Sequence, residues 1–459
     1  MTTLPPQPLS PLDGRYRPVV TALADHLSEA GLNRARVEVE VEWLITLTDR
    51  SLFGTHPLPD DKKTALRALY LTFGQAEIDW LAEREAVTRH DVKAVEYLVR
   101  DRLAALDLDA IAELTHFACT SEDINSLSYA LTVQRAVTQV WLPALRAVIE
   151  RLRQLSAEHR DAPMLSRTHG QPATPTTMGK ELAVFAARLQ RVAARIEASE
   201  YLGKFSGATG TWSAHLAAAP EVNWPLVARE FVESLGLDFN PLTTQIESHD
   251  WQVELYDLAR HAGGILHNLA TDVWTYISLG YFTQIPVAGA TGSSTMPHKI
   301  NPIRFENAEA NLEIAGALFG SLSQTLVTSR LQRDLTDSST QRNIGVAFGH
   351  SLLALDNLRR GLGEISLADD LLLADLDANW EVLGEAIQTV VRAEVVAGRS
   401  SISDPYALLK ELTRGRRVGA ADLAAFIGGL EIGDAARERL LALTPATYTG
   451  LAAQLVDEA

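Results

Sequence analysis

Apolar residues recur at alternating spacings of three and four along several long stretches of this chain. One run comprises Leu182, Phe185, Leu189, Val192 and Ile196, and similar runs occupy residues 255–269 and 344–355. This spacing places the apolar side chains on one face of an α-helix, and the alternation is typical of nearly antiparallel bundles. We expect helices of up to about 25 residues, or ~37 Å. Helices of that length usually pack on other segments or other chains.

Two further segments refine this prediction. Residues 121–157 are expected to be helical, with Thr120 as N-cap, Asp123 three residues on, and a kink or break at Pro143. In residues 37–45 valines alternate with glutamates, which fits a strand, yet the same residues also fit a helix face. We predict a helix there, because no other region supplies convincing strands to pair with it.

Glycine and proline cluster between the predicted helices, at residues 172–175, 203–210 and 286–302. The last cluster lies between two strong helix patterns and has the composition of a mobile loop. The sequence therefore predicts an all-α fold with three helical domains. These are an N-terminal domain at 1–110, a central long-helix bundle at 111–363 that contains the loop, and a small C-terminal domain at 364–459.

Composition excludes several classes of protein. The 459 residues are 46% hydrophobic and 22% charged, which allows a large core, and no run of about 18 apolar residues predicts a membrane span. Residues 1–12 do not have the pattern of a secretory signal. The net charge of −17 argues against nucleic acid as a partner, although a small basic pocket would still suit an anionic metabolite.

The cysteine and histidine content bears on metals and on location. The single cysteine, Cys119, excludes an intrachain disulfide and a thiolate-rich zinc site, and it makes the cytoplasm the expected compartment. Twelve histidines leave a histidine–carboxylate metal site possible in principle, but no HExxH or similar spacing supports one. We therefore expect no metal.

Three polar motifs are candidates for chemistry. Residues 292–302 combine a glycine, two serines, Lys299 and Asn301 just before a helix expected from Ile303, so they could surround a carboxylate or only cap the helix. Residues 166–175 contain His169 before a glycine, which taken alone is more often structural. Residues 115–125 place Thr120 and Ser121 at a helix start, as a cap or as an anion site.

Together these motifs resemble the three signature regions of the fumarase/aspartase superfamily, whose members eliminate fumarate from succinyl-type substrates. The loop matches that superfamily's G-S-S-x-M-P-x-K-x-N pattern at every fixed position. Within the superfamily the chain resembles the longer bacterial type of adenylosuccinate lyase. The resemblance extends over almost the whole chain, through residues 10–16, 90–97, 243–247, 333–338 and 412–417.

Single positions separate this family from its relatives. His298 precedes the loop lysine, where argininosuccinate lyases typically have Gln and fumarases a small residue. His169 is present, whereas carboxymuconate cycloisomerases lack it. Arg89 departs from the pattern, since close relatives are expected to have Asn there.

The resemblance implies a cofactor-free homotetramer with active sites shared between subunits. It implies that Ser293 is the general base, with Ser294 as the competing candidate, and that His169 is the general acid, paired with Glu306. Lys299, Asn301, the loop amides, Thr120 and Ser121 would stabilise the aci-carboxylate intermediate. The substrates would be small succinylated nucleotides, and no membrane would be involved.

Further substrate contacts are carried over by the same resemblance. Those for the nucleotide and its phosphate are Arg15, Tyr16, Arg333, Ser338 and Arg342. The others are Arg89, His90, Asp91, Gln245, Ser294, Ile300 and Asn307. Three alternatives stay open, namely another fumarate-releasing lyase such as an argininosuccinate lyase, a non-catalytic helical protein, and a metal-dependent hydrolase.

Overall fold

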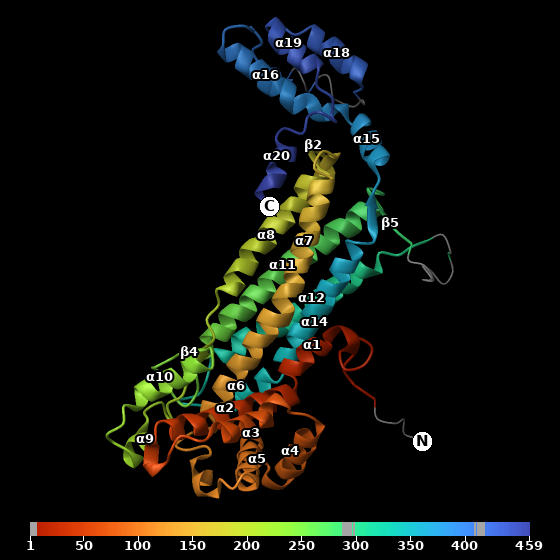
Figure 1. Ribbon diagram of the computed structural model, residues 1–459. Helices are drawn as coiled ribbons and strands as arrows, with labels where there is room; N and C mark the ends of the chain where they lie inside the picture. Colours follow the sequence, from red (N-terminus) through yellow and green to blue (C-terminus); the bar gives the residue numbers. More distant parts are fainter. Residues whose placement is uncertain (1–6, 287–295, 297–298, 408–409, 411–417) are drawn as a thin grey trace. The chain divides into compact units, whose positions relative to one another are not determined.

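The computed structural model describes residues 7–286, 296, 299–407, 410 and 418–459 (Figure 1). The chain forms two compact units. Unit 1 comprises Met1–Leu145, Val192–Gly264 and Ala310–Asp356, and unit 2 comprises Arg146–Arg191, Ile265–Glu309 and Asn357–Ala459. Most of the secondary structure is helical, which confirms the predicted fold class. The three-domain boundaries near residues 110 and 363 stay a prediction.

Unit 1 contains the helices of the N-terminal part of the chain. These are α1 (Arg17–Leu27), α2 (Glu29–Asp49), α3 (Asp60–Leu71), α4 (Gln75–Thr88), α5 (Asp91–Ala105) and α6 (Ser121–Ala136). Later segments of this unit add α9 (Ser213–Ala218), α10 (Trp224–Ser234) and α13 (Thr336–Gln341). Single 3₁₀ turns occupy Leu52–Gly54 and Asp109–Leu114. Helix α2 packs against α1, α3, α5 and α6, so it lies at the centre of this group.

The ambiguous valine–glutamate segment is helical, as predicted, and lies within α2. Val37, Val39 and Val41 are all fully buried, because partners cover α2 around most of its circumference. The intervening glutamates are paired with cations from other helices and loops. Arg135 bonds Glu38 with two contacts of 2.7 Å, and His116 Nδ1 lies 2.6 Å from Glu40 Oε1. The strand-like alternation therefore reflects a buried helix that alternates apolar packing with ion pairs.

The predicted long helices are present. They are α7 (Leu142–Glu158), α8 (Met178–Glu197), α11 (Asp250–Ser278), α12 (Ile303–Leu326) and α14 (Ile344–Gly361). Within unit 1 the rings of Tyr256, Phe319 and Phe348 contact one another, with centroids 5.0–6.1 Å apart. This aromatic cluster joins α11, α12 and α14. A π-helical turn at Val137–Trp141 separates α6 from α7, so regular α-helical geometry is interrupted beside Pro143, as expected.

Unit 2 ends in a small helical region. Its helices are α15 (Asp369–Asp377), α16 (Gly384–Val396), α18 (Ala420–Gly428), α19 (Asp434–Leu441) and α20 (Ala452–Leu455), with 3₁₀ turns at Trp380–Leu383 and Val456–Glu458. Side chains from α16, α18 and α19 form their own core, which includes Ile387, Val391, Leu423, Ile427 and Leu440. No helix in the described ranges is both long enough and apolar enough to span a membrane.

The described residues also contain three short strand pairs, which the sequence analysis did not predict. Strands β1 (Pro163–Thr168) and β2 (Gln171–Thr177) pair antiparallel, β3 (Leu202–Gly203) pairs parallel with β4 (Asp238–Phe239), and β5 (Phe282–Gln284) pairs antiparallel with β6 (Ile365–Leu367). Each sheet has two strands. Strands this short show almost no period-two alternation in the sequence. The prolines of the second motif also argued against a strand there, so the β1–β2 hairpin was not predicted.

Candidate active site

His169 lies at the tip of the β1–β2 hairpin, which connects α7 to α8 (Figure 1). Thr168 pairs with Gln171, so His169 and Gly170 form a two-residue turn, with φ of 53° and 74°. A turn with positive φ at both positions matches the twist of a hairpin, and glycine adopts it without strain. The imidazole of His169 is consequently exposed, and the short hairpin turn that carries it has a defined backbone conformation.

Two polar contacts fasten this hairpin within unit 2. Arg167 Nη2 lies 2.8 Å from Asp375 Oδ2 on α15, and Thr174 Oγ1 donates to Glu385 Oε2 on α16 at 2.6 Å. Asp375 also accepts a hydrogen bond from the Tyr281 hydroxyl. The hairpin that carries His169 is therefore attached to the C-terminal helices of the same unit.

The start of α12 carries the remaining unit 2 candidates. Trp274 Nε1 donates to Glu306 Oε1 at 3.2 Å, and Asn357 Nδ2 donates to Asn307 Oδ1 at 3.0 Å. Lys299 and Ile300 are exposed, and Asn301 is half-buried. Helix α12 begins at Ile303, as expected. Ser293, Ser294 and His298 lie outside the described residues.

Thr120 and Ser121 lie at the N-terminus of α6 in unit 1. The Thr120 N–H donates to Asp123 Oδ2 at 2.8 Å, which confirms the predicted cap. Asp123 Oδ1 accepts from the N–H groups of Ser206 and Gly207 at 2.8 and 3.2 Å, and from Lys204 Nζ at 2.7 Å. Asp123 therefore fixes the Thr120–Ser121 turn to the loop after β3.

The arginines expected at the phosphate contact carboxylates in unit 1. Arg333 Nη2 lies 2.8 Å from Glu122 Oε1 and donates to Ser338 Oγ at 3.1 Å. Arg342 pairs with Glu29 and lies 3.4 Å from Asp91 Oδ2. Burial raises the pKa of Glu122 above its ordinary value, although Arg333 partly offsets the effect.

Residues 89–91 connect α4 to α5. Arg89 ends α4 with φ of 53°, and His90 caps α5 by accepting the Lys93 N–H at 3.2 Å. Asp91 Oδ2 lies 2.8 Å from Arg36 Nη2. Burial alone would raise the pKa of Asp91, but its attraction to Arg36 and its bond from the Val92 N–H lower that pKa overall. The Asn expected in place of Arg89 tolerates this left-handed conformation better than Arg does.

The segment with Gln245 lies against the 207–210 loop. Gln245 Nε2 donates to the Ala208 carbonyl at 3.1 Å, and Thr244 Oγ1 donates to the Gln332 carbonyl at 2.9 Å. A Cβ at Gly210 would lie 2.1 Å from the Thr243 carbonyl oxygen, so only glycine allows this approach. The hydrogen bond from Thr244 to Gln332 places Gln245 in the part of unit 1 that also holds Arg333.

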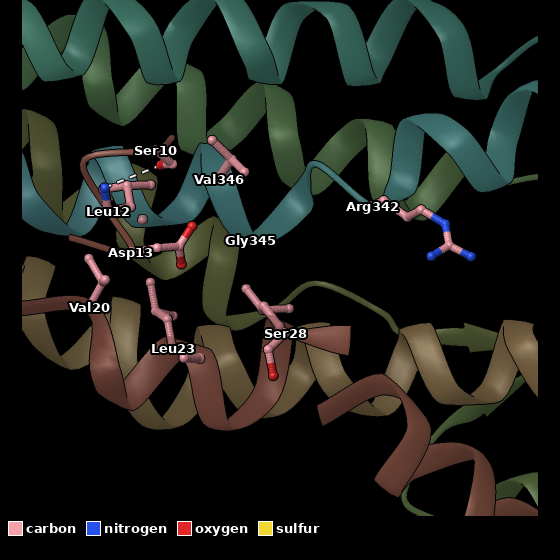
Figure 2. A pocket seen from close by; sticks show the side chains of 12 residues that line it. Ser10, Leu12, Asp13, Val20, Leu23, Ser28, Arg342, Gly345 and Val346 are labelled. Carbon is pink, nitrogen blue, oxygen red and sulfur yellow. Dashed lines mark hydrogen bonds between the residues drawn. The ribbon is translucent and has the colours of Figure 1, made fainter. Parts of the chain in front are cut away.

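A cavity of about 130 Å³ lies between residues 10–13, α1 and α14 (Figure 2). Its lining is mainly apolar and includes Leu12, Val20 and Leu23, while Arg342 stands at its edge with the guanidinium directed away from them. The Arg15 guanidinium lies 5.9 Å from the centre of the Tyr16 ring, just before α1. Arg15 and Tyr16 thus belong to the same region of unit 1 as Arg342.

Sequence reasoning missed several polar residues of unit 1. Arg36, Asn125 and Glu122 connect candidate residues, whereas His249 and Asp337 form a buried pair and His116 and Glu40 a partly buried one. Glu122 and Asn125 stand inside the third motif, and Arg36 interrupts an apolar helix face. A charged residue on an apolar face was the available signal, but its partners are remote in sequence.

Comparison with known proteins assigns the family. Residues 32–318 match the family model described as lyase, and residues 329–449 match the one described as adenylosuccinate lyase C-terminal. The chain is 47% identical to adenylosuccinate lyase of Escherichia coli strain K12 over 452 residues, which is 98% of each chain. The chain belongs to the adenylosuccinate lyase family.

Other adenylosuccinate lyases are similarly close. That of Vibrio cholerae is 47% identical over 98% of both chains, and that of Legionella pneumophila strain Corby is 46% identical over 98% of this chain and 97% of its own. The fold is also that of a fumarate lyase from Mesorhizobium sp. BNC1, with a TM-score of 0.75, 20% identity, and 95% and 96% of the two chains covered. A 3-carboxy-cis,cis-muconate lactonizing enzyme from Pseudomonas putida gives a TM-score of 0.74, also at 20% identity, with the same coverage. Family membership makes the chain a lyase.

Proposed function

We propose that this chain eliminates fumarate from adenylosuccinate, giving AMP, and from succinylaminoimidazole carboxamide ribotide, giving the free carboxamide ribotide. The similarity to adenylosuccinate lyases over 98% of the chain carries this proposal. The sequence also retains the serine, lysine, asparagine and histidine that the reaction needs, at 293, 299, 301 and 169. This argues against a non-catalytic protein.

The reaction is a β-elimination that removes a proton from carbon and breaks a C–N bond. Ser293 takes the proton from the carbon next to a carboxylate, and His169 gives a proton to the departing nitrogen. A histidine suits the second role because it titrates near neutral pH. Its exposed place at a hairpin tip is consistent with meeting substrate bound by other segments. Glu306, which accepts a hydrogen bond from Trp274, is the carboxylate that pairs with His169 in this proposal.

The intermediate is a doubly charged aci-carboxylate, so the site must supply positive charge and hydrogen-bond donors. Lys299 and Asn301 provide them from the loop before α12. Thr120 and Ser121 stand at the N-terminus of α6, and the positive end of a helix dipole favours an anion. Fixed donors of this kind are usually the largest single contribution to such catalysis.

The nucleotide phosphate binds to Arg333, Ser338 and Arg342, with Arg15 and Tyr16 nearby. Arginine suits phosphate because its planar guanidinium can donate two parallel hydrogen bonds. The remaining proposed substrate contacts are Arg89, His90, Asp91, Gln245, Ser294, Ile300 and Asn307.

The active enzyme is a homotetramer in the cytoplasm, and each active site combines segments from different subunits. The long amphipathic helices support this arrangement, because bundles of such helices bury apolar faces between chains. The substrate is a small succinylated nucleotide, and the reaction uses neither a cofactor nor a metal.

A spectrophotometric assay on adenylosuccinate tests the proposal. The wild type should release fumarate from adenylosuccinate in preference to argininosuccinate and aspartate. Ser293→Ala and His169→Ala should each lose at least ~100-fold in activity, as expected for acid–base groups. His56→Ala, at an exposed position outside the motifs, serves as the control. A wild type inactive on adenylosuccinate, or variants as active as the wild type, would overturn the proposal, and loss of activity on chelation would point to a metal enzyme.

A further inference from the structure

Arg36 is a buried charged residue that is not among the expected substrate contacts. It belongs to α2, and its side chain is only 2% exposed. Its Nε donates to Asn125 Oδ1 at 2.9 Å, its Nη1 donates to Asn33 Oδ1 at 2.9 Å, and its Nη2 lies 2.8 Å from Asp91 Oδ2. A guanidinium this deep is stable only when it is paired and hydrogen-bonded, so its three partners are fixed along with it.

Two of these partners lead to the arginines expected at the phosphate. Through Asp91, Arg36 reaches Arg342, whose Nη2 lies 3.4 Å from the same Oδ2 atom. Through Asn125, it reaches Glu122, since Asn125 Nδ2 donates to Glu122 Oε1 at 2.8 Å. Glu122 Oε1 in turn lies 2.8 Å from Arg333 Nη2. All of these residues belong to unit 1.

Three guanidinium groups alternate with three carboxylates in this network. Arg36, Arg333 and Arg342 face the carboxylates of Asp91, Glu122 and Glu29. An incoming phosphate must therefore draw the exposed guanidinium of Arg342 away from its carboxylates. Arg36 cannot follow, because it is buried, so it remains as the countercharge of Asp91. Without Arg36, Asp91 would attract Arg342 more strongly. The phosphate would then bind more weakly, because it competes with Asp91 for Arg342.

We propose that Arg36 is the positioning residue of the phosphate subsite, holding Asp91 and the Asn125–Glu122 arm so that Arg342 and Arg333 are available to the nucleotide phosphate. The proposal rests on the function proposed above. Arg36 does not contact the substrate, and it acts through Asp91 and Asn125. Lysine cannot replace it fully, because one ammonium cannot reproduce the planar fork that reaches three acceptors.

The test compares three variants with a matched control. Arg36→Met removes the charge, and Arg36→Lys keeps it. Asn125→Ala removes only the connection from Arg36 to Glu122, so we expect it to disturb the fold least. Arg135→Met is the control, because Arg135 also joins α6 to α2, through Glu38, but contacts no residue of this network. The measurements are KM and kcat on adenylosuccinate, inhibition by AMP and by fumarate, and the melting temperature.

For Arg36→Met we expect KM to rise about 10-fold and AMP inhibition to weaken equally, which is the effect of losing a charged hydrogen bond. Inhibition by fumarate, which lacks the phosphate, and kcat should change less than about threefold. Arg36→Lys should recover part of the loss, and Asn125→Ala should raise KM in the same direction. Arg135→Met should lower the melting temperature and leave KM unchanged.

The outcomes separate this inference from the proposed function. If the wild type is active on adenylosuccinate and both Arg36→Met and Asn125→Ala keep its KM and its AMP inhibition, Arg36 has only a structural role. If Arg36→Met does not fold, the KM of Asn125→Ala and of Arg36→Lys decides the question. A wild type without this activity contradicts the proposed function, and AMP binding measured calorimetrically on the same variants then decides the role of Arg36.

Discussion

Lys204 Nζ and Asp123 Oδ1 lie 2.7 Å apart, and both side chains are completely buried. Lys204 also donates to the Gly207 carbonyl at 2.7 Å, and Asp123 accepts three backbone N–H groups. The pair joins the start of α6, with its Thr120–Ser121 turn, to the loop after β3. Its polar atoms are satisfied, which is the condition under which a buried ion pair is tolerated.

Removing one member of this pair should destabilise the protein strongly. We expect Lys204→Met to lower the free energy of unfolding by about 3–5 kcal/mol, because it leaves the Asp123 charge buried without its cation. Lys63→Met is the matched control, since Lys63 pairs with the more exposed Asp49 and should cost less than about 1 kcal/mol. Urea unfolding measures both. Equal losses would mean that burial of the pair does not matter.

Arg89 offers a stabilising substitution. It holds a left-handed φ of 53° at the end of α4, which costs a residue with an ordinary side chain about 1–2 kcal/mol. Arg89→Asn should therefore raise the free energy of unfolding by about 1 kcal/mol, since Asn adopts this conformation more readily. Arg84→Asn, inside the same helix, should lower it instead, because Asn is a weaker helix former. Thermal unfolding of the two variants should shift in opposite directions.

His215 should make stability depend on pH. It is 1% exposed and lies beside the rings of Trp43 and Trp224, and neither ring nitrogen has a hydrogen-bond partner among the described residues. Burial lowers the pKa of His215 to about 4, from an ordinary value of 6.5. Between these values the unfolded chain binds a proton that the folded chain does not. This contribution to stability is therefore complete above pH 6.5 and falls as the pH drops towards 4.

The expected slope from this one residue is about 1.4 kcal/mol per pH unit over that window. Urea unfolding at pH 7.5 and at pH 5 measures it. His215→Leu should reduce the difference in stability between the two pH values by about 1–2 kcal/mol. His56→Leu, at an exposed position, should leave that difference as it is in the wild type. An unchanged difference in His215→Leu would show that the ring is hydrated or paired in solution.

Mixing inactive variants tests whether active sites are shared. Ser293→Ala and His169→Ala proteins, unfolded together and reassembled, should recover activity, because some sites then receive both intact residues from different subunits. Random assembly of a tetramer should restore about a quarter of the sites. The same treatment of each variant alone is the control. Activity that never exceeds that of the separate variants would place both residues of each site in one subunit.

Much of the fold was predictable from local pattern. Helices α8, α11 and α14 follow from their apolar spacing, and the cap at Thr120 follows from Asp123 three residues later. The β1–β2 hairpin was missed, because its short strands contain prolines and its turn resembles any polar loop. The candidate residues were identified by motif resemblance. Their spacing alone was equally compatible with purely structural roles, such as helix capping.

By itself the sequence determined the helical class, the ends of several helices and the family motifs. These depend on residues a few positions apart, whose relation is set by the period of the backbone. Only the tertiary structure decided that Arg36 meets both Asp91 and Asn125, and that Glu122 meets Arg333. Such pairs join positions dozens to hundreds of residues apart. Their geometry and their burial, which sets their electrostatic strength, exist only after the helices have packed.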